Sequence, residues 1–362
     1  MTIMQEDRSW PLILFVAALV LLVSGMLLWV AISGIGRKTI SSSVLTVPPQ
    51  ENAAASGAMF VPRAIDGIRV PATEAHLLPF AVMIDNHADA RPSAGLAAAN
   101  LVFEAPVEGG LTRYLAIYDA TSTAEMIGPV RSARTYFVEI AESLNAAYVH
   151  LGGSPEALEK LKKIRGFRNL DEIANGAFFW RSGKRSPPHH VFTRMDLLRS
   201  AALVKDWHVA PSHLWSYKED APLESTTTTV RGRGQGPSVA YGGASDVSWT
   251  YDRTSNAYLR TLARKPHVDA DGTRVQAKNV VMMLTDAHVV DAERRLALRT
   301  TGRGAAIVAG DGRTVPAAWQ RSPGEMFQLY GIDGTDVFLN RGTTWIEIVT
   351  SKEVFEKAAT LK

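Results

Sequence analysis

Residues 11 to 32 contain no Asp, Glu, Lys or Arg, and no other stretch constrains the chain as strongly. A helix rises about 1.5 Å per residue, so this run would span roughly 33 Å, which matches the hydrocarbon core of a bilayer. Trp10 and Trp29 lie near its two ends, where indole rings favour the membrane interface. The run therefore predicts one transmembrane helix at residues 11–32, preceded by a cytoplasmic tail at residues 1–10.

The charges that flank this run give only a weak signal for its orientation. Arg8 precedes it, whereas Arg37 and Lys38 follow it, and basic residues favour the cytoplasmic side. The difference is small, and long domains translocate largely regardless of it. We expect a single-pass protein of the cell membrane with an extracytoplasmic soluble part. The alternative is a signal peptide that is cleaved near residues 31–33, although the apolar run is longer than a usual signal.

The composition excludes several classes of protein and of site. Hydrophobic residues make up 46% of the chain and charged residues 21%, as in packed globular domains, so disorder of the whole chain is excluded. There is no cysteine, which excludes disulfides, thiolate metal sites, cysteine nucleophiles and a lipid-modified cysteine. The net charge is only +3, so no nucleic-acid partner is expected.

Two low-complexity stretches divide the rest of the chain. Residues 33–63 are rich in Ser, Ala and Pro, which indicates a spacer between membrane and domain. Residues 219–236 hold four consecutive threonines and an Arg/Gly run, which indicates a linker more than an RNA-binding segment. The soluble part is therefore expected to consist of one domain at 64–218 and a second domain at 237–358.

Residues 64–218 are predicted to form an α/β domain, because strand and helix signals alternate along them. Short apolar runs indicate buried strands at residues 80–84, 101–103, 111–118 and 146–151. Helices are indicated at residues 132–144, after the Ser154-Pro155 start signal, and at 194–204 behind a capping box of Thr193 and Asp196.

Residues 237–358 are predicted to form a small β-rich domain that ends in a helix at 351–359. Short apolar runs separated by Asp-Gly turn signals indicate its strands. These runs cover residues 247–251, 257–262, 280–284, 295–299, 305–308 and 345–349. The aromatic residues of this part are expected to fill its core, with a sugar-binding platform as the alternative.

Several short motifs of the soluble part are specific. They are Ala81-Val82-Met83-Ile84-Asp85-Asn86, Ala90-Arg91-Pro92, Glu104-Ala105-Pro106-Val107-Glu108-Gly109-Gly110, Gly128-Pro129-Val130-Arg131-Ser132-Ala133-Arg134, Pro188-His189 and Gly342-Thr343-Thr344-Trp345-Ile346. By these motifs the chain resembles the YerB-like lipoprotein family over nearly all of residues 64–350. The resemblance implies a bacterial envelope protein in two parts, of unknown function, so it assigns no catalytic residue. Since this sequence has no cysteine to acylate, the predicted transmembrane helix would replace the lipid as anchor.

The motif at residues 128–134 is a candidate site for an anion. A Gly-Pro turn leads into a predicted helix, whose first N–H groups lack partners and whose dipole is positive at this end. Arg131 and Arg134 add two guanidinium groups, and such an arrangement suits a phosphate or a carboxylate. The structural alternative is that these arginines pair with Glu104 or Glu108.

His150 is a second candidate, because it ends a predicted strand and precedes Gly152-Gly153. Ligands of open α/β sheets bind beyond the carboxyl ends of the strands, so His150 is placed to act as an acid or a base. A structural histidine with both ring nitrogens bonded is the alternative. Ser154 is better explained as a helix cap than as a nucleophile, because the nucleophile-elbow motif is absent.

Glu104 and Glu108 lie close to Arg113 in sequence, on the other side of a Gly-Gly turn. The two carboxylates have the composition of an acid/base pair of the glycosidase type, or they orient Arg113 and Arg131. The catalytic candidates are therefore His150, Glu104 and Glu108. The ligand-binding candidates are Arg113, Arg131, Arg134, His150 and His189.

His189 and His190 follow two prolines and offer two imidazole rings. Neighbouring residues on a strand point to opposite faces, so the two rings are a poor chelating pair. Zinc binding with help from His87 and His150 is an alternative, but no His-x-x-x-His or Glu-x-x-His spacing supports it. No metal and no cofactor are therefore predicted.

Three functions of different class fit these features. The first is a membrane-anchored, extracytoplasmic envelope protein that binds an anionic small molecule or glycan, or a protein partner. The second is a hydrolase or transferase that acts on an anionic cell-envelope polymer. The third is a scaffold in which the Arg/Glu motif only holds the fold. Binding is ranked first because the chain has no P-loop, no dinucleotide fingerprint and no nucleophile elbow.

Overall fold

The structure, a computed structural model, describes residues 59–208, 214–224 and 230–359. The predicted tail at 1–10, the predicted transmembrane helix at 11–32 and the spacer up to residue 58 lie outside the described residues. Within the described residues, no helix is both long and apolar enough to cross a membrane. Residues 58–362 belong to one compact unit.

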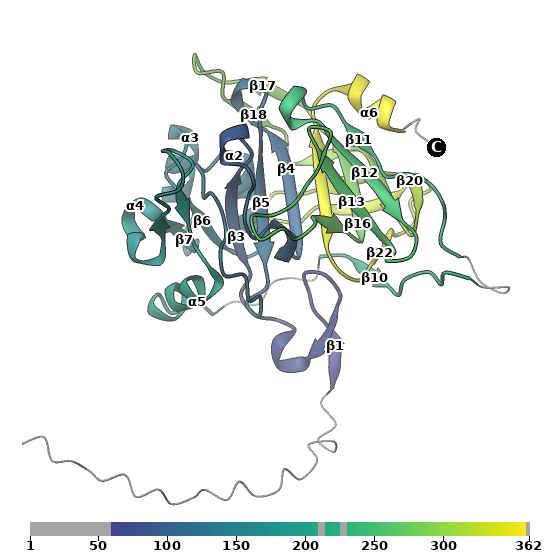
Figure 1. The fold of residues 1–362 in the computed structure, drawn as a ribbon, viewed down its shortest axis with the longest axis horizontal. Coiled ribbons are helices and arrows are strands. Elements are labelled where there is room, and N and C mark those ends of the chain that lie inside the picture. The colour runs from purple at the N-terminus through teal and green to yellow at the C-terminus, as the bar shows by residue number, and fades with distance from the viewer. Residues whose placement is uncertain (1–58, 209–213, 225–229, 360–362) are drawn as a thin grey trace, which may run out of the picture. The chain divides into compact units, whose positions relative to one another are not determined.

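A mixed sheet of ten strands is the centre of this unit, in the order β21-β20-β19-β16-β23-β4-β5-β3-β6-β7 (Figure 1). In that order the strands are Gln328–Gly331, Arg313–Arg321, Gly302–Gly310, Asn279–Leu284, Thr344–Val349, Leu101–Pro106, Thr112–Tyr118, Phe80–Asp85, Ala147–His150 and Asn169–Asp171. Four neighbouring pairs are parallel: β16 with β23, β23 with β4, β3 with β6, and β6 with β7. The other neighbours are antiparallel.

A second sheet and four two-stranded ladders surround this central sheet. The second sheet consists of β11 (Ser238–Val239), β12 (Val247–Asp252), β13 (Ala257–Leu262), β14 (Lys265–Pro266) and β15 (Gln276–Ala277). The ladders pair β1 (Phe60–Pro62) with β2 (Arg69–Pro71), β8 (Trp180–Arg181) with β9 (Val191–Phe192), β10 (Ser216–Lys218) with β22 (Phe338–Asn340), and β17 (Ala287–Val289) with β18 (Leu296–Leu298). The predicted spacer therefore ends earlier than expected, since β1 lies within it.

The described α-helices are short. They are α2 (Thr135–Ser143), α3 (Pro155–Lys163), α4 (Glu172–Asn175), α5 (Met195–Val204) and α6 (Lys352–Ala359). In Figure 1, α3, α4 and α5 lie beside β6 and β7 at one end of the sheet. The Ser154 cap of α3 is confirmed, because the Ser154 hydroxyl accepts from the amide of Ala157. The capping box of α5 is wrong: the Thr193 hydroxyl donates to the carbonyl of Phe178, and no side chain caps the helix.

The predicted fold class, an α/β domain followed by a small β-rich domain, is wrong for the described residues, and the transmembrane helix predicted in front of it lies outside them. Strands dominate, and β23 near the C-terminus pairs along β4, so that Trp345 lies opposite Val102. Both β4 and β23 are buried along nearly their whole length, so each requires a neighbour at both edges. Apolar periodicity identifies such strands but not their partners. The predicted linker at 219–236 stays a prediction.

Apolar residues from both halves of the chain fill the same cores. One core combines Phe103 with Trp319, Phe327 and Ile346. The core on another face combines Tyr114 with the aromatic residues Trp249, Tyr258 and Trp345. The expectation that the aromatic residues of the C-terminal part fill a core is confirmed for these side chains, which are buried.

We expect a fragment of residues 59–218 to lack a cooperative unfolding transition, because β4 would lose β23 and the cores would lose their C-terminal residues. Far-UV circular dichroism during heating checks this against residues 59–362. Mixing with a fragment of residues 230–362 is expected to restore the transition. A native-like cooperative transition of the first fragment alone would show instead that it is an independent domain.

The candidate anion and histidine site

The candidate site is built around Asp85, the last residue of β3. Across the antiparallel pair of β3 and β5, Asp85 lies opposite Arg113. The segment that carries Arg131 runs beside β3, since the amide of Arg131 donates to the carbonyl of Met83 and the amide of Asp85 donates to the carbonyl of Pro129. Two basic residues are thereby fixed next to one buried carboxylate.

Asp85 has two partners of potentially positive charge. Its Oδ2 lies 2.9 Å from Nε of Arg131 and 2.7 Å from Nδ1 of His189. Burial alone would raise the pKa of Asp85, but the charge of Arg131 and the hydrogen bond with His189 hold it below its usual value. Asp85 is therefore ionised at neutral pH and orients both side chains.

Glu108 pairs with the other two arginines of the cluster. It follows β4 in a turn where Gly109 and Gly110 have φ values of 75° and 70°, which favour glycine. Its carboxylate accepts from Nη2 of Arg113 at 3.4 Å and from Nε of Arg134 at 3.1 Å. Although burial opposes ionisation, the hydrogen bond from Arg134 and the charge of Arg113 lower the pKa of Glu108. The structural alternative, pairing with Glu104 or Glu108, is thus present for Arg134 but not for Arg131, whose partner is Asp85.

The arginines of the cluster differ in how completely they are bonded. Arg134 also donates to the carbonyl of Ala133, and Arg113 donates to the carbonyl of Ser132. Burial, followed by the charge of Arg134, lowers the pKa of Arg113 to about 10, so it stays protonated at neutral pH. For Arg131, the contact with Asp85 is its one ion pair within the described residues, its buried Nε makes no hydrogen bond there, and none is present for its two Nη groups.

The side chain of His150 is fully buried and bonds to none of these arginines within the described residues, although the next residue, Leu151, donates its amide to the carbonyl of Arg131. Its Nδ1 lies 2.7 Å from the carbonyl oxygen of Gly152, and its Nε2 lies 2.6 Å from Oδ1 of Asn169. Both ring nitrogens are therefore engaged, as in the structural alternative. The structure brings together Arg113, Arg131, Arg134 and His189, but it does not bring His150 to them.

Glu104 belongs to a separate cluster in the interior. Its Oε1 accepts from the Thr112 hydroxyl at 2.6 Å and from Nδ2 of Asn86 at 3.2 Å, and its Oε2 pairs with Arg260. The Arg260 guanidinium lies 4.6 Å from the ring centroid of Trp345. Glu104 and Arg260 have no exposed surface, so Glu104 cannot reach a ligand from this position.

Glu347 of β23 completes this interior cluster. It accepts hydrogen bonds from Nε1 of Trp249 at 2.9 Å and from the hydroxyl of Tyr241 at 3.0 Å. Burial and the nearby charge of Glu104 raise the pKa of Glu347 well above its usual value. Since two carboxylates share one guanidinium, Arg260 neutralises Glu104 and Glu347 retains a proton at neutral pH.

A hollow of about 690 Å³, here called the basic hollow, opens beside His189. Its lining consists of Asp89, Arg91, Lys184, Arg185, Ser186, Pro187, Pro188 and His189. Arg91 donates to the carbonyl of Asn86 at 2.7 Å, and Arg185 donates to the carbonyls of Ala90 and Pro92, so these two arginines tie the walls together. The Lys184 side chain is exposed and has no ion pair within the described residues.

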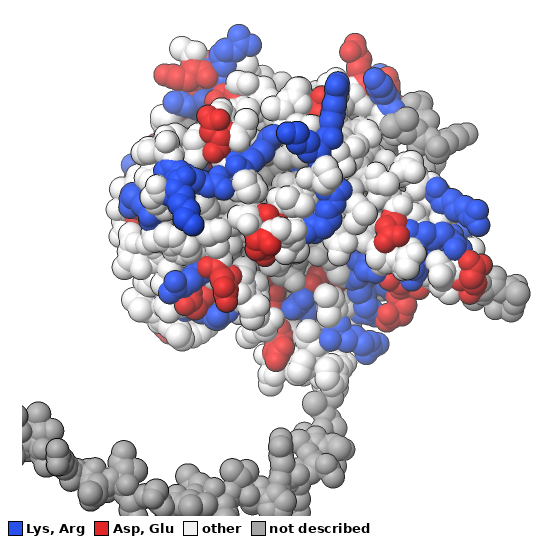
Figure 2. Space-filling model, in the orientation of Figure 1, with Lys and Arg blue, Asp and Glu red and all other residues white. Residues whose placement is uncertain are grey.

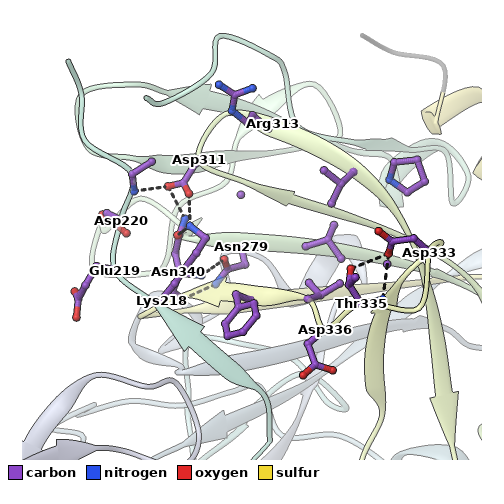
Figure 3. A pocket seen from close by; sticks show the side chains of 18 of the residues that line it. Lys218, Glu219, Asp220, Asn279, Asp311, Arg313, Asp333, Thr335, Asp336 and Asn340 are labelled. Atoms are coloured by element: carbon purple, nitrogen blue, oxygen red, sulfur yellow. Dashed lines mark hydrogen bonds and ion pairs between the residues drawn. The ribbon is translucent and has the colours of Figure 1, made fainter. Parts of the chain in front are cut away.

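A larger hollow, about 960 Å³, lies in the C-terminal half (Figure 3). Asp311 holds one wall: it pairs with Lys218 and accepts from Asn256 at 2.8 Å and from Asn340 at 2.9 Å. Figure 3 shows Asp333 and Thr335 bonded to each other at the other end. The polar groups of this hollow are largely satisfied by one another, so its geometry favours a structural role for them.

Comparisons with known proteins agree with the motifs. The chain matches the "Protein of unknown function (DUF3048) N-terminal domain" at residues 67–208 and the corresponding C-terminal domain at residues 238–346. "Putative lipoprotein YerB" of Bacillus subtilis (strain 168) is 29% identical over 279 residues, which cover 75% of this chain and 81% of that protein. The crystal structure of YerB protein from Bacillus subtilis has a TM-score of 0.71 at 26% identity, over 81% of this chain and 98% of that chain.

The chain belongs to the YerB-like family. The resemblance seen in the sequence motifs is thereby confirmed, including the division of the family into two parts. Family membership assigns no reaction and no ligand, because the function of both parts is unknown. Candidate residues in this member must therefore be judged by their contacts.

Sequence reasoning missed three residues of these clusters. Asp85 was not among the candidate residues, although its place at the end of a buried strand was a usable signal. Arg260 carried no signal, since it lies in a strand more than one hundred residues from Glu104. Glu347 was hidden in an apolar run, where an isolated carboxylate is itself a signal of a buried partner.

We expect Glu347→Gln to change the pH dependence of stability. Above the ordinary glutamate pKa of about 4.3, the unfolded chain releases a proton that folded Glu347 keeps. The free energy of unfolding of the wild type should therefore lose up to about 1.4 kcal/mol per pH unit from this group as pH rises. Glutamine is neutral in both states, so this loss should vanish. Urea unfolding between about pH 5 and pH 7 measures how the free energy of unfolding changes with pH, and Glu353→Gln, at an exposed glutamate, is the control. The same change with pH in the wild type and both variants would contradict the conclusion that folded Glu347 retains a proton.

Proposed function

We propose that this protein is an extracytoplasmic envelope protein that binds an anionic ligand in the basic hollow. The envelope assignment draws on the name of its Bacillus relative, which calls that protein a lipoprotein. This sequence contains no cysteine, so the lipid attachment implied by that name has no acceptor thiol here. Anion binding is supported by an excess of cationic side chains at the hollow and by the hydrogen-bond donors of Arg131 that have no partner within the described residues.

The observation that carries the proposal is an excess of positive charge around a solvent-open space. The cationic side chains in and behind the hollow are Arg91, Arg113, Arg131, Arg134, Lys184 and Arg185, and the carboxylates are Asp85, Asp89 and Glu108. Six cations thus face three carboxylates, an excess of three charges. Crowded guanidinium groups repel one another and lose hydration, and a bound anion relieves both costs.

Arg131 is the residue best placed to respond to an anion. Its side chain keeps 18% of its surface exposed, whereas Arg113 and Arg134 keep 7% and 6%. Asp85 connects it to the hollow, because the same carboxylate binds Arg131 and the hollow residue His189. Its two Nη groups, which have no hydrogen-bond partner in the part of the chain that the structure describes, suit a phosphate or a carboxylate, which accept paired N–H bonds from a guanidinium.

A diffuse positive field also surrounds part of the molecule. Figure 2 shows Lys and Arg side chains gathered in a band across one face, with fewer carboxylates between them. Such a field attracts anions without holding them, and added salt screens it within about 10 Å at 0.1 M. A test of the hollow therefore needs a control that removes the same charge elsewhere.

Hydrolysis or transfer on an anionic polymer is the second candidate function. One contact favours it: Asp85 orients His189 through Nδ1, as a carboxylate orients the base of a catalytic triad, and this leaves Nε2 to accept a proton. The earlier candidates do not support it, since His150 and Glu104 are buried and bonded. Release of phosphate or sugar from such a polymer, lost in His189→Gln, would favour this function.

We expect Arg131→Ala to weaken anion binding at least about tenfold, because a charge-assisted hydrogen bond contributes about 1.5–3 kcal/mol. Calorimetry with inorganic phosphate, glucose 6-phosphate and glucuronate measures the affinity. Lys184→Ala, which removes an exposed side chain, should also weaken binding while leaving the melting temperature unchanged. Arg165→Ala is the matched control, since it removes one exposed charge outside the hollow.

Two outcomes would contradict the proposal. If no anion raises the melting temperature of the wild type and Arg131→Ala unfolds the protein, the cluster is an internal ion network. If Lys184→Ala and Arg165→Ala weaken binding equally, anions respond to the surface field and not to the hollow.

A further inference from the structure

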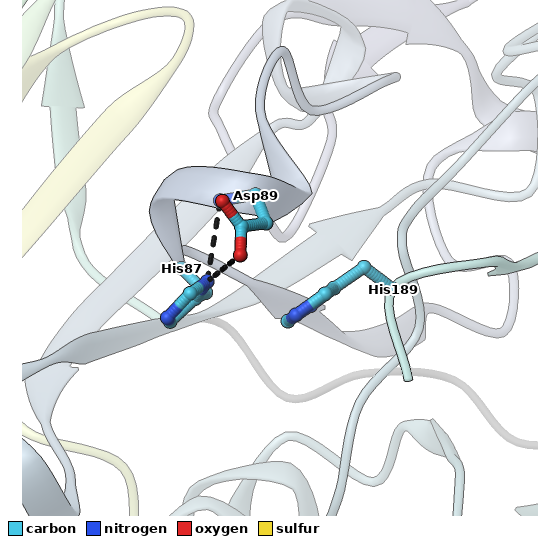
Figure 4. A group of neighbouring side chains, drawn as sticks. All are labelled: His87, Asp89 and His189. Carbon is cyan, nitrogen blue, oxygen red and sulfur yellow. Dashed lines mark hydrogen bonds and ion pairs between the residues drawn. The ribbon is translucent and has the colours of Figure 1, made fainter. Parts of the chain in front are cut away.

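Three potential metal ligands meet at the edge of the basic hollow. His87 directly precedes the short 3-10 helix η2 (Ala88–Ala90), which carries Asp89, and His189 comes from the segment between β8 and β9. One ligand atom from each of the three residues lies within 4.8 Å of the other two. Figure 4 shows the carboxylate of Asp89 and the ring of His189 facing the ring of His87.

We propose that His87, Asp89 and His189 bind a divalent transition-metal ion, for which zinc is the best chemical match. Two imidazole nitrogens and one carboxylate oxygen form a common donor set of catalytic zinc sites. Zinc bonds of about 2.0–2.1 Å in tetrahedral geometry separate two ligand atoms by roughly 3.4 Å. Nδ1 of His87 and Oδ2 of Asp89 are 3.6 Å apart, and a metal at Nδ1 would replace the hydrogen bond that this nitrogen accepts from the Asp89 amide at 3.2 Å.

Asp85 prepares His189 for this role. Its carboxylate lies 2.7 Å from Nδ1 of His189, which places the proton on Nδ1 and leaves the lone pair of Nε2 for a metal. Carboxylates commonly support metal-binding histidines in this way, and they also fix the ring orientation. Asp85 is itself held by Arg131, so His189 is positioned by buried groups and not by solvent-exposed contacts.

The backbone around the three ligands is tied together across about one hundred residues of sequence. Arg185, four residues before His189, donates to the carbonyls of Ala90 and Pro92, which follow Asp89. The rings of His87 and His189 stack with centroids 4.9 Å apart and planes 11° apart. Lone pairs lie in the ring planes, so one of the two stacked rings must turn before both can bind one ion, whereas the bonds of Arg185 already hold the two ligand-bearing segments close together and thereby lower the cost of binding.

A fourth coordination position would face the basic hollow, because Asp89 and His189 both line it. Sites with three protein ligands and one open position take water or substrate at the fourth. This inference goes beyond the proposed anion function, since the three ligands are positioned without an anion. The two are compatible, because a bound cation adds positive charge at the edge of the hollow.

Calorimetry of zinc binding to the full chain, prepared without a polyhistidine tag, tests the inference. The absorption spectrum of bound Co²⁺, used in place of zinc, reports the coordination geometry. We expect one zinc ion per chain. His87→Ala and Asp89→Asn should each raise the dissociation constant at least about tenfold, and Asp85→Asn should do so by about 10–100-fold through the orientation of His189. His87 and Asp89 are exposed enough for these changes to leave the fold intact.

His208→Ala is the matched control. His208 and Asp206 form an exposed His/Asp pair with Nε2 and Oδ1 2.7 Å apart, but neither belongs to a group of three potential ligands within the described residues. Its zinc affinity should equal that of the wild type. Failure of the wild type to bind zinc, or equal affinity in wild type, His87→Ala and Asp89→Asn, would overturn the inference. Phosphate binding measured in EDTA keeps the anion proposal separate, since it tests the hollow without any metal.

Discussion

The position of β23 between β16 and β4 is the constraint on which the rest of the structure depends. This strand comes from near the C-terminus, yet it completes the hydrogen bonding of a strand from the N-terminal half. It also carries Glu347 to the buried pair of Glu104 and Arg260. A buried charge that loses its partner costs about 3–5 kcal/mol, so sheet order and ion cluster require each other.

The same sheet places the polar cluster at its edge. Asp85 ends β3 and lies opposite Arg113 at the start of β5, so one ladder positions both. Asp85 and Glu108 each serve two basic side chains, which allows several buried guanidinium groups to lie together without complete neutralisation. The positive charge that remains distinguishes this cluster from the interior one. There, Arg260 neutralises Glu104 and Glu347 retains a proton, so the three side chains together carry no net charge.

The two hollows also differ in how completely their polar side chains are bonded to other residues. Around the larger one, Asp311 is surrounded by Lys218, Asn256 and Asn340, and these bonds explain why the groups are there. At the basic hollow, Lys184 has no ion pair within the described residues, and behind it the buried Nε of Arg131 makes no hydrogen bond there. Size alone would have favoured the larger hollow, whereas unsatisfied donors favour the smaller one.

By itself the sequence determined the local elements and the family. Helix α2, the Ser154 cap of α3 and the buried strands were predictable, because each depends on the spacing or type of a few neighbouring residues. The arginines at 113, 131 and 134 were predictable as a group from their motifs. Glu108, the partner of Arg113 and Arg134, was one of two alternatives, and only the fold chose between it and Glu104, while Arg131 pairs with Asp85 instead.

Only the tertiary structure decided which strands pair and which polar groups meet. Glu104 and Arg260 are 156 residues apart in sequence, and Asp85 and His189 are 104 apart, so no local pattern relates them. Tertiary contacts also overrode local signals: the Thr193 hydroxyl bonds to Phe178 instead of capping α5, and His150 is sealed between Gly152 and Asn169. A buried polar group takes the partner that the fold brings to it, and that partner is set by packing across the whole chain.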